Sequence, residues 1–108
     1  MRYRVRFHTP AERNLTEIVA WLRSYSPEGA ARWLNRFETT IERIIRDPHV
    51  YGRAAESEAV EKDIREAFFK TPRGNKYRIL FAINDRIVEI LTIRSPGQNF
   101  VDPAEFDF

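Results

Sequence analysis

Two apolar segments late in the chain constrain the fold more than any other feature. Residues 77–83 and 87–93 are rich in β-branched and aromatic side chains, and Asn84-Asp85 between them favours a two-residue turn. With that turn, Phe81 would pair with Val88 and Ile79 with Ile90 on one face of the hairpin. The opposite face would also be largely apolar, because it would carry Leu80, Ala82, Ile87, Leu91 and Ile93. A sheet built on this hairpin therefore needs cover on both faces.

The first half of the chain predicts one strand and two helices. Residues 2–8 alternate between basic and apolar side chains, as in a half-buried strand. Residues 9–12, Thr-Pro-Ala-Glu, predict a capping box that opens a helix reaching to about residue 23. Ser26-Pro27 opens a second, longer helix, which ends at Asp47-Pro48. Trp21 and Trp33 lie near the apolar stripes of these helices, so both are expected to pack in the core.

The second half of the chain predicts three strands. Residues 48–62 show no clear period and are expected to form a loop with at most a short turn of helix, in which Glu56, Glu58 and Glu61 are solvated. Residues 63–70 predict a strand before the hairpin. The order is β-α-α-β-β-β, an α+β fold in which a helical hairpin packs on one face of a mainly antiparallel four-stranded sheet. We expect one domain over residues 1–95 and an irregular acidic tail over residues 96–108.

The second apolar face of the sheet has two possible covers. The C-terminal tail could fold back over it with Phe100, Phe106 and Phe108, or another protein chain could dock on it. We favour the second interpretation, and we expect the partner to contact Leu80, Ala82, Ile87, Leu91 and Ile93.

Composition excludes several classes of protein. The chain has 108 residues and no cysteine, so it has neither disulfides nor a thiolate metal site, and no segment approaches 18 apolar residues. A cytoplasmic protein with no membrane partner is expected. The net charge of +2 does not require a nucleic-acid partner, yet arginine outnumbers lysine by 15 to 3. Arginine suits carboxylates and phosphates, although a GC-rich genome would give the same bias.

The order of several short motifs resembles the RelE/ParE superfamily of type II toxin–antitoxin toxins, on its ParE-like, plasmid-stabilisation branch. The motifs are the strand ending at Pro10, "LTEIVAWL", "SPEGAARW", "IIRDPHVYG", "IREAFF", "YRILFAIN" and "VEILTIRS". Together they span residues 2–95. The resemblance implies the fold derived above and a cognate antitoxin that wraps the toxin. It implies no cofactor and no metal, and it allows a homodimer or a toxin–antitoxin heterotetramer.

The resemblance implies one of two activities. ParE-like members inhibit DNA gyrase by binding, whereas RelE-like members cut mRNA on the ribosome without a metal ion. Metal-free cleavage needs a base, an acid and cations for the phosphate. The candidate cations are Arg65, Arg78 and Arg94, which three strands could bring together at one end of the sheet.

The residues that would transfer protons are not evident in the sequence. Residues 95–100, Ser-Pro-Gly-Gln-Asn-Phe, carry no titratable side chain where active RelE-like members place one. His8 and His49 are expected to be plain surface or helix-flanking residues, and Tyr51 or Tyr77 could act as an acid only with a shifted pKa. We therefore favour a non-catalytic gyrase inhibitor. The alternatives are an mRNA endoribonuclease and a degenerate member that only binds antitoxin.

Overall fold

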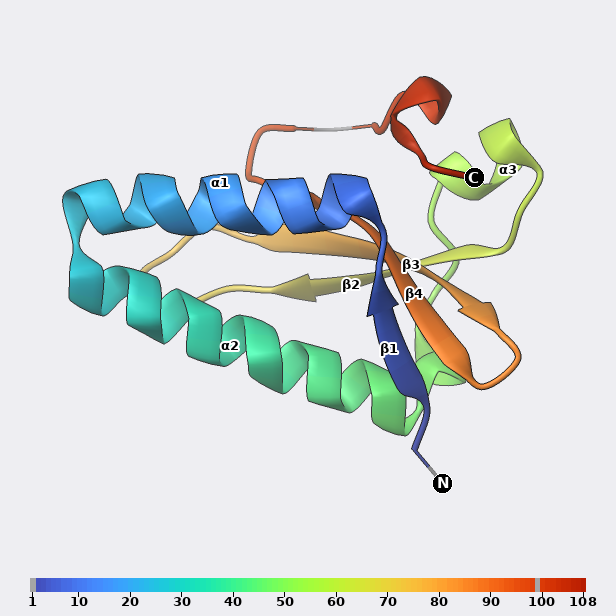
Figure 1. Cartoon of the computed structure of the whole chain (residues 1–108), viewed down its shortest axis with the longest axis horizontal. Helices are drawn as coiled ribbons and strands as arrows, with labels where there is room; N and C mark the ends of the chain where they lie inside the picture. The colour runs from blue at the N-terminus through green and yellow to red at the C-terminus, as the bar shows by residue number, and fades with distance from the viewer. Residues whose placement is uncertain (1, 99) are drawn as a thin grey trace.

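The helices and strands follow the predicted order, with short helices added between and after them. The structure is a computed structural model that describes residues 2–98 and 100–108. The main elements are β1 (Arg4–Phe7), α1 (Thr9–Tyr25), α2 (Pro27–Arg46), β2 (Ile64–Phe69), β3 (Tyr77–Asn84) and β4 (Ile87–Arg94) (Figure 1). The additions are α3 (Glu56–Val60) and the 3-10 helices η1 (Pro48–Val50) and η2 (Pro103–Glu105). None of the helices described is both long and apolar enough to cross a membrane.

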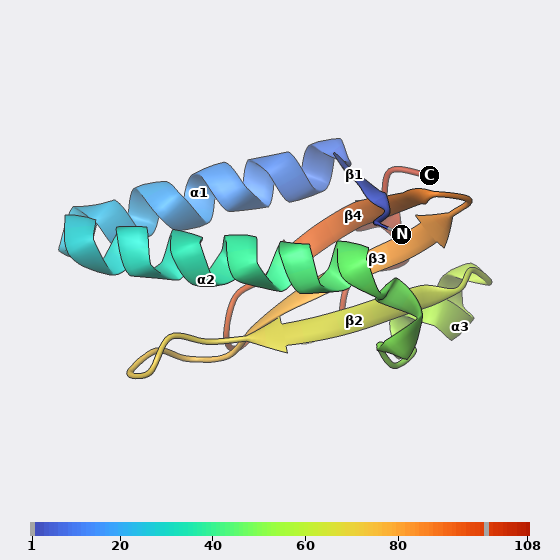
Figure 2. The ribbon, with the colours of Figure 1, turned by 90° about the horizontal axis from the view of Figure 1, so that it is seen from below.

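The four strands form one sheet in the order β1-β4-β3-β2. β2 with β3 and β3 with β4 are antiparallel, whereas β1 is parallel to β4. The helical hairpin of α1 and α2 covers one face of this sheet (Figure 2). The α+β prediction is therefore confirmed.

The two long helices begin by different means. Ser26 caps α2 as predicted, since its hydroxyl accepts a 3.0 Å hydrogen bond from the Gly29 backbone N–H. The capping box predicted for the first helix was wrong. Thr9 is already helical, and the N-cap is His8, whose side chain makes no capping bond. Pro10 still fixes the backbone in the first turn.

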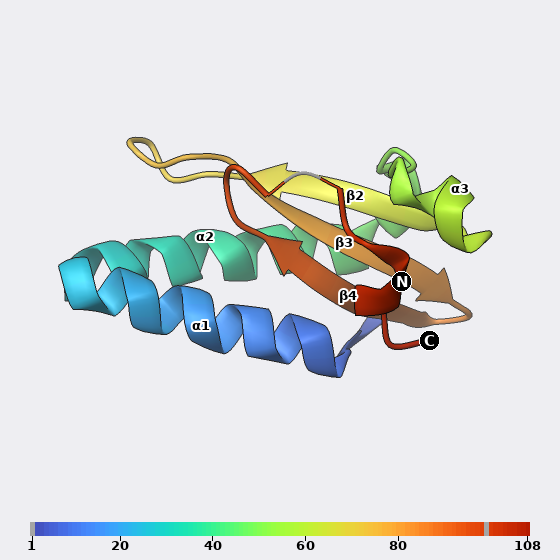
Figure 3. The same cartoon turned by 90° about the horizontal axis from the view of Figure 1, so that it is seen from above.

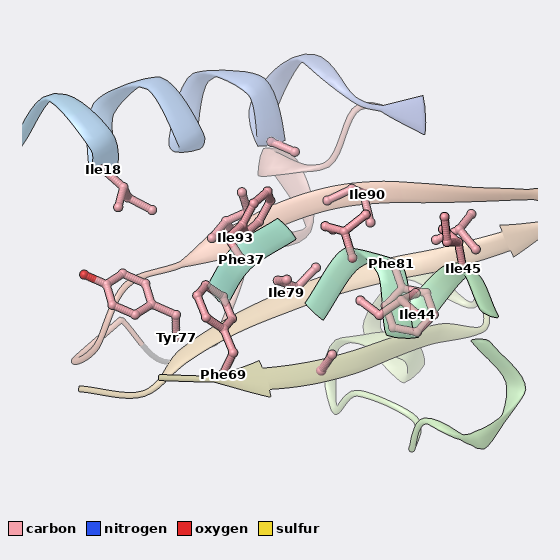
Figure 4. Close-up of a cluster of buried hydrophobic side chains, with 14 of the residues drawn as sticks. Ile18, Phe37, Ile44, Ile45, Phe69, Tyr77, Ile79, Phe81, Ile90 and Ile93 are labelled. Carbon is pink, nitrogen blue, oxygen red and sulfur yellow. The ribbon is translucent and has the colours of Figure 1, made fainter. Parts of the chain in front are cut away.

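The main core lies between the helices and the sheet. α2 contributes Trp33 to this core. It also contributes Phe37 and Ile44, which pack with strand residues such as Phe69, Ile79 and Phe81 (Figure 4). Trp33 is 3% exposed, as the prediction of a packing residue requires. The same prediction was wrong for Trp21, which is 58% exposed.

The hairpin has the predicted faces as far as Leu91 but a different register. Asp85 and Arg86 form the turn, with Asp85 at a φ of 59°, so Phe81 pairs with Ile90 instead of Val88. A bulge follows, because Leu80 pairs with Thr92 and leaves Leu91 as the extra residue. The bulge reverses the alternation of side chains, so Ile93 pairs with Ile79 and joins the helix-side core. Ile93 was therefore wrongly assigned to the second face.

The second face is covered by the chain itself. Its cluster consists of Ala54, Ile64, Leu80, Leu91, Val101 and Phe106. Figure 3 shows the C-terminal segment and α3 on the side of the sheet opposite the helices. Val101 is fully buried and Phe106 is 9% exposed, whereas Phe100 and Phe108 are about half exposed. Of the two predicted covers, the folded-back tail accounts for this burial, although the docking of another chain was the favoured interpretation.

Candidate functional site

Two of the three candidate arginines meet at one end of the sheet. Arg78 begins β3 and Arg94 ends β4, and the two residues pair directly across the strands. Their side chains are only 17% and 12% exposed, and both line the same pocket on the tail side of the sheet. The structure therefore brings together two of the three arginines that were predicted to converge.

Arg65 lies elsewhere, so the expected group of three arginines does not form. It pairs with Phe81 in the middle of β3, and its neighbours Ala67 and Phe69 on the same face of β2 belong to the helix-side core. Its guanidinium donates to the backbone carbonyls of His49 and Tyr51, at 3.1 and 2.7 Å. Arg65 therefore ties η1 and the residue that follows it to the sheet, and it faces away from the other two arginines.

Glu56 is the most deeply buried charged group of the site. It is 0% exposed, it forms an ion pair with Arg78, and it accepts a 2.9 Å hydrogen bond from the Val101 backbone N–H. The expectation that Glu56 is solvated was wrong, because α3 turns this side chain under the tail. Glu58 and Glu61 are exposed, as expected.

Carboxylates hold both arginines of the pair. Arg78 also contacts Glu66 of β2 at 3.1 Å. Arg94 contacts Glu105 at 3.1 Å and donates to the Phe100 carbonyl at 3.2 Å. The tail thus meets the sheet through polar contacts at the arginines and through apolar contacts at Val101 and Phe106.

The ionisation of this network follows from those contacts. Burial opposes the charge of Glu56, but hydrogen bonds from the Arg78 guanidinium and the Val101 N–H outweigh it and lower the pKa of Glu56. Burial likewise opposes the charge of Arg78, and the two carboxylates outweigh it and raise the pKa of Arg78. Glu56 is therefore an ionised acceptor at neutral pH and not a proton donor.

A pocket of about 380 Å³ opens beside the pair. Lys76 adds a third cation to its lining and lies 4.6 Å from the ring centre of Phe68. The site thus holds three cations and three carboxylates, so its formal charges cancel. The cations are Lys76, Arg78 and Arg94, and the carboxylates are Glu56, Glu66 and Glu105. Phosphate recognition requires surplus positive charge, and the internal pairs reduce it.

The candidate proton-transfer residues lie on other surfaces. Tyr51 and Tyr77 both belong to the helix side of the sheet, and burial raises the pKa of each phenol. His8 was expected to be a plain surface or helix-flanking residue. It does flank α1, but its side chain is 10% exposed and contacts Glu89 at 3.0 Å. Among the described residues, no three His, Cys, Asp or Glu side chains are grouped to hold a metal ion.

Comparison with known proteins identifies the family. The family model of the ParE toxin of the type II toxin–antitoxin system parDE matches residues 5–100, nearly the whole chain. The chain belongs to the ParE toxin family. A search of curated proteins gave no match.

Two solved structures share the fold of this ParE-family toxin. One is the toxin–antitoxin complex RelBE2 from Mycobacterium tuberculosis, with 27% identity over 87% of this chain and 98% of the other, at a TM-score of 0.50. The other is a mutant of the Escherichia coli toxin RelE in the free state, with 15% identity over 90% and 86% of the two chains and a TM-score of 0.50. At 15% identity, the similarity to the RelE structure supports a shared fold and nothing more.

The residues predicted to contact the antitoxin differ in access in this ParE-family toxin. Leu80 and Leu91 lie at 0% and 1% exposure beneath the tail, and Ile93 faces the helices. Ala82 and Ile87 are partly exposed near the turn of the hairpin. Any partner that reaches Leu80 or Leu91 must first move the tail.

Sequence reasoning missed the residues that hold the tail, above all Glu56, Val101 and Glu105. Glu56 gave no signal, because it lies in a segment without periodicity. The tail did carry one: residues 102–105, Asp-Pro-Ala-Glu, form a capping box in the structure. The similar segment at residues 9–12 suggested such a box and forms none. The same signal therefore marks an ordered turn at residues 102–105 of this ParE-family toxin but does not by itself distinguish the two segments.

Proposed function

We propose that this ParE-family toxin stops growth by binding DNA gyrase and that a cognate antitoxin neutralises it. The observation that carries the proposal is the pairing of Arg78 and Arg94 with Glu56, Glu66 and Glu105. Cations held by internal carboxylates are poorly suited to stabilise charge on a scissile phosphate. The described residues of the pocket also offer no group suited to proton transfer at neutral pH. Inhibition by binding needs neither property.

The second candidate function is cleavage of mRNA on the ribosome. It is favoured by one observation, the convergence of Lys76, Arg78 and Arg94 on a single pocket. Cleavage at this pocket would require RNA phosphates to replace the carboxylates as partners of the arginines. A member that only binds antitoxin is the third candidate, and toxicity distinguishes it from the other two.

The proposed antitoxin follows from the family and from the complex of RelBE2, the structure of 27% identity described above. We propose that it contacts Ala82 and Ile87, which are partly exposed, and reaches Leu80 and Leu91 where it displaces the tail. Ile93 is not included, because it faces the helices. Leu91→Asp would bury an unpaired charge whether the tail or the antitoxin covers Leu91, so it cannot separate the two. Ile87→Asp is therefore the sharper test of antitoxin contact.

The decisive experiment measures which synthesis stops first. Labelled thymidine and labelled methionine are supplied in the first minutes after expression is induced in bacteria that lack the antitoxin. We expect thymidine incorporation to fall first and purified protein to inhibit supercoiling by gyrase. An earlier fall in methionine incorporation, with loss of that effect in the double variant Arg78→Ala and Arg94→Ala, would replace the gyrase proposal by the nuclease. Unchanged growth would favour the antitoxin-binding member.

A further inference from the structure

The outer side of α2 carries a stripe of four arginines. These residues are separated by 4, 7 and 3 positions, which are whole turns of a helix, so they stack along one side of it. All four are exposed, whereas the buried residues of α2, such as Trp33 and Phe37, face the sheet that α2 crosses (Figure 2). The members of this arginine stripe are Arg32, Arg36, Arg43 and Arg46.

No arginine of the stripe forms an ion pair with a described residue. A glutamate does lie one turn before the first arginine of the stripe and another one turn before the last. Glu28 lies 3.5 Å from the hydroxyl of Ser26, however, and Glu42 pairs with Arg2. The stripe therefore carries the surplus positive charge that the buried arginine pair of the sheet lacks.

This surplus charge is unfavourable in the first half of the stripe. Arg32 and Arg36 are four positions apart, a spacing at which like charges destabilise a helix. Arg43 and Arg46 are compensated in part, because they lie in the last turn, where the helix dipole favours cations. Arg32 and Arg36 have no such compensation within the described part of the chain, so an anion from outside the chain would stabilise them.

A pocket of about 510 Å³ lies beside these first two arginines. α2 forms one side of the pocket, and the turn between β2 and β3 forms the other. Amide and hydroxyl side chains join the two guanidinium groups there, and both kinds of group commonly bond to phosphate oxygens in complexes with nucleic acids. The lining residues are Arg32, Asn35, Arg36, Thr39, Thr71 and Pro72.

The composition of the stripe indicates the class of anion. Between the arginines it presents Asn35 and Thr39, and it contains no aromatic or apolar side chain. Protein interfaces are centred on apolar and aromatic side chains, and single-stranded nucleic acids stack their bases on aromatic rings. A duplex backbone requires only cations and hydrogen-bond donors. The stripe is about 21 Å long, and one strand of a duplex carries about six phosphates over that length.

We propose that the arginine stripe binds the phosphodiester backbone of duplex DNA without reading its sequence. The choice of DNA over duplex RNA rests on the proposed function, because the substrate of gyrase is a DNA duplex. In that arrangement the toxin contacts gyrase and the DNA held by gyrase at the same time. The stripe lies on the helix side of the molecule, so the tail and the Arg78–Arg94 pair take no part in this contact.

Fluorescence anisotropy of a short labelled DNA duplex of mixed sequence, titrated with the intact chain, tests the stripe without gyrase. We expect log Kd to rise with log salt concentration at a slope of about 3 to 4, since each phosphate contact contributes about 0.9. Arg32→Gln combined with Arg36→Gln should lower that slope by about 2 and raise Kd about tenfold or more at about 50 mM salt.

The matched control removes the same charge from α1. Arg13→Gln combined with Arg23→Gln alters two exposed arginines outside the stripe and should change Kd about twofold or less. All four substituted side chains are exposed, so both double variants should fold, and circular dichroism checks this. An RNA duplex of the same sequence, measured at the same salt concentration, forms the second arm, and we expect DNA to bind at least as tightly as RNA.

Three results would overturn the proposal: a Kd for DNA weaker than about 0.1 mM at about 50 mM salt, equal losses in the two double variants, or a preference for RNA of about tenfold or more. The two proposals can fail separately. A chain that binds DNA through the stripe but does not inhibit gyrase would reject the proposed function alone. Inhibition of gyrase by a chain that does not bind DNA would reject the stripe alone.

Discussion

The two faces of the sheet are covered in different ways. Fifteen of the described residues form the helix-side cluster, whereas six form the tail-side cluster. The helix-side cover comes mainly from apolar area, from two helices of 17 and 20 residues, with few polar contacts such as the 3.1 Å hydrogen bond from the Ile93 N–H to Asn14 of α1. The tail-side cover combines a few apolar contacts with the ion pairs of Arg78 and Arg94. The same sheet therefore carries one face fixed mainly by packing and another whose cover also depends on charge.

The largest expected effect is on the helix side. Phe81→Ala removes a fully buried ring from the middle of β3 and should lower the free energy of unfolding by about 3–5 kcal/mol, because it creates a cavity under α2. Urea unfolding followed by circular dichroism measures the loss. Val50→Ala is the control, since Val50 is 70% exposed and should change stability by about 0.5 kcal/mol or less. Equal losses in the two variants would contradict the core described here.

The charged network of the tail side should rank second. Glu56→Gln leaves Arg78 with Glu66 as its remaining carboxylate, so the loss should be about 2–3 kcal/mol, below the full value for breaking a buried pair. Urea unfolding measures it, with the exposed Glu58→Gln as the matched control. A loss no larger than that of Glu58→Gln would show that the ion pair does not hold the tail.

The same substitution predicts a pH dependence. The pKa of Glu56 is lowered in the folded protein, so its contribution to stability is complete above the ordinary glutamate value of about 4.3 and is lost as pH falls through the lowered value. The difference between the parent chain and Glu56→Gln should therefore be constant from pH 7 to about pH 5 and shrink in more acid solution. Urea unfolding over this range measures it. A difference that grows on acidification would contradict the assigned direction.

A smaller effect is expected from the apolar anchor of the tail. Val101→Ala removes two buried methyl groups and should cost about 1–2 kcal/mol. Phe108→Ala removes a larger side chain but should cost less, because Phe108 is 57% exposed. Urea unfolding compares the two, and amide hydrogen exchange in residues 100–106 should accelerate only in Val101→Ala. The reverse order of losses would show that the tail is held by its aromatic end.

The smallest effect should come from the outer ion pair. Glu105 is 47% exposed at its side chain, so Glu105→Gln should cost less than about 1 kcal/mol and the cost should decrease in high salt. Urea unfolding at low and at high ionic strength measures both quantities. A large, salt-independent loss would mean that Arg94 depends on Glu105 as strongly as Arg78 depends on Glu56.

Local sequence signals predict some elements of this fold and not others. The helices and the hairpin could be predicted, because Ser26-Pro27, Asp47-Pro48 and the apolar periods are local signals. The bulge at Leu91 could not, since it depends on how β4 fits between β1 and β3, and it moved Ile93 to the other face. Local alternation also could not show that Arg65 and Arg78 face opposite sides, because it does not fix which strand face meets the helices.

The candidate site was the least predictable part. The pairing of Arg78 with Arg94 follows from the hairpin, so it could be inferred. Their partners could not, because Glu56 and Glu105 come from segments without periodic patterns and reach the arginines only when the tail is in place. The charge of this network depends on contacts between residues 11 to 45 positions apart in the chain, whereas sequence patterns report on neighbours.

The parallel pairing of β1 with β4 has a consequence for synthesis on the ribosome. Arg4 pairs with Ile87, so the first strand to be made has no sheet partner until the last of the four strands has been made. Contacts between residues so far apart in sequence form slowly and only after the intervening chain is available. The helical hairpin can form earlier, but the sheet on which it packs is completed late. Nascent chains of this toxin therefore remain incompletely folded, and their surfaces unassembled, for most of translation.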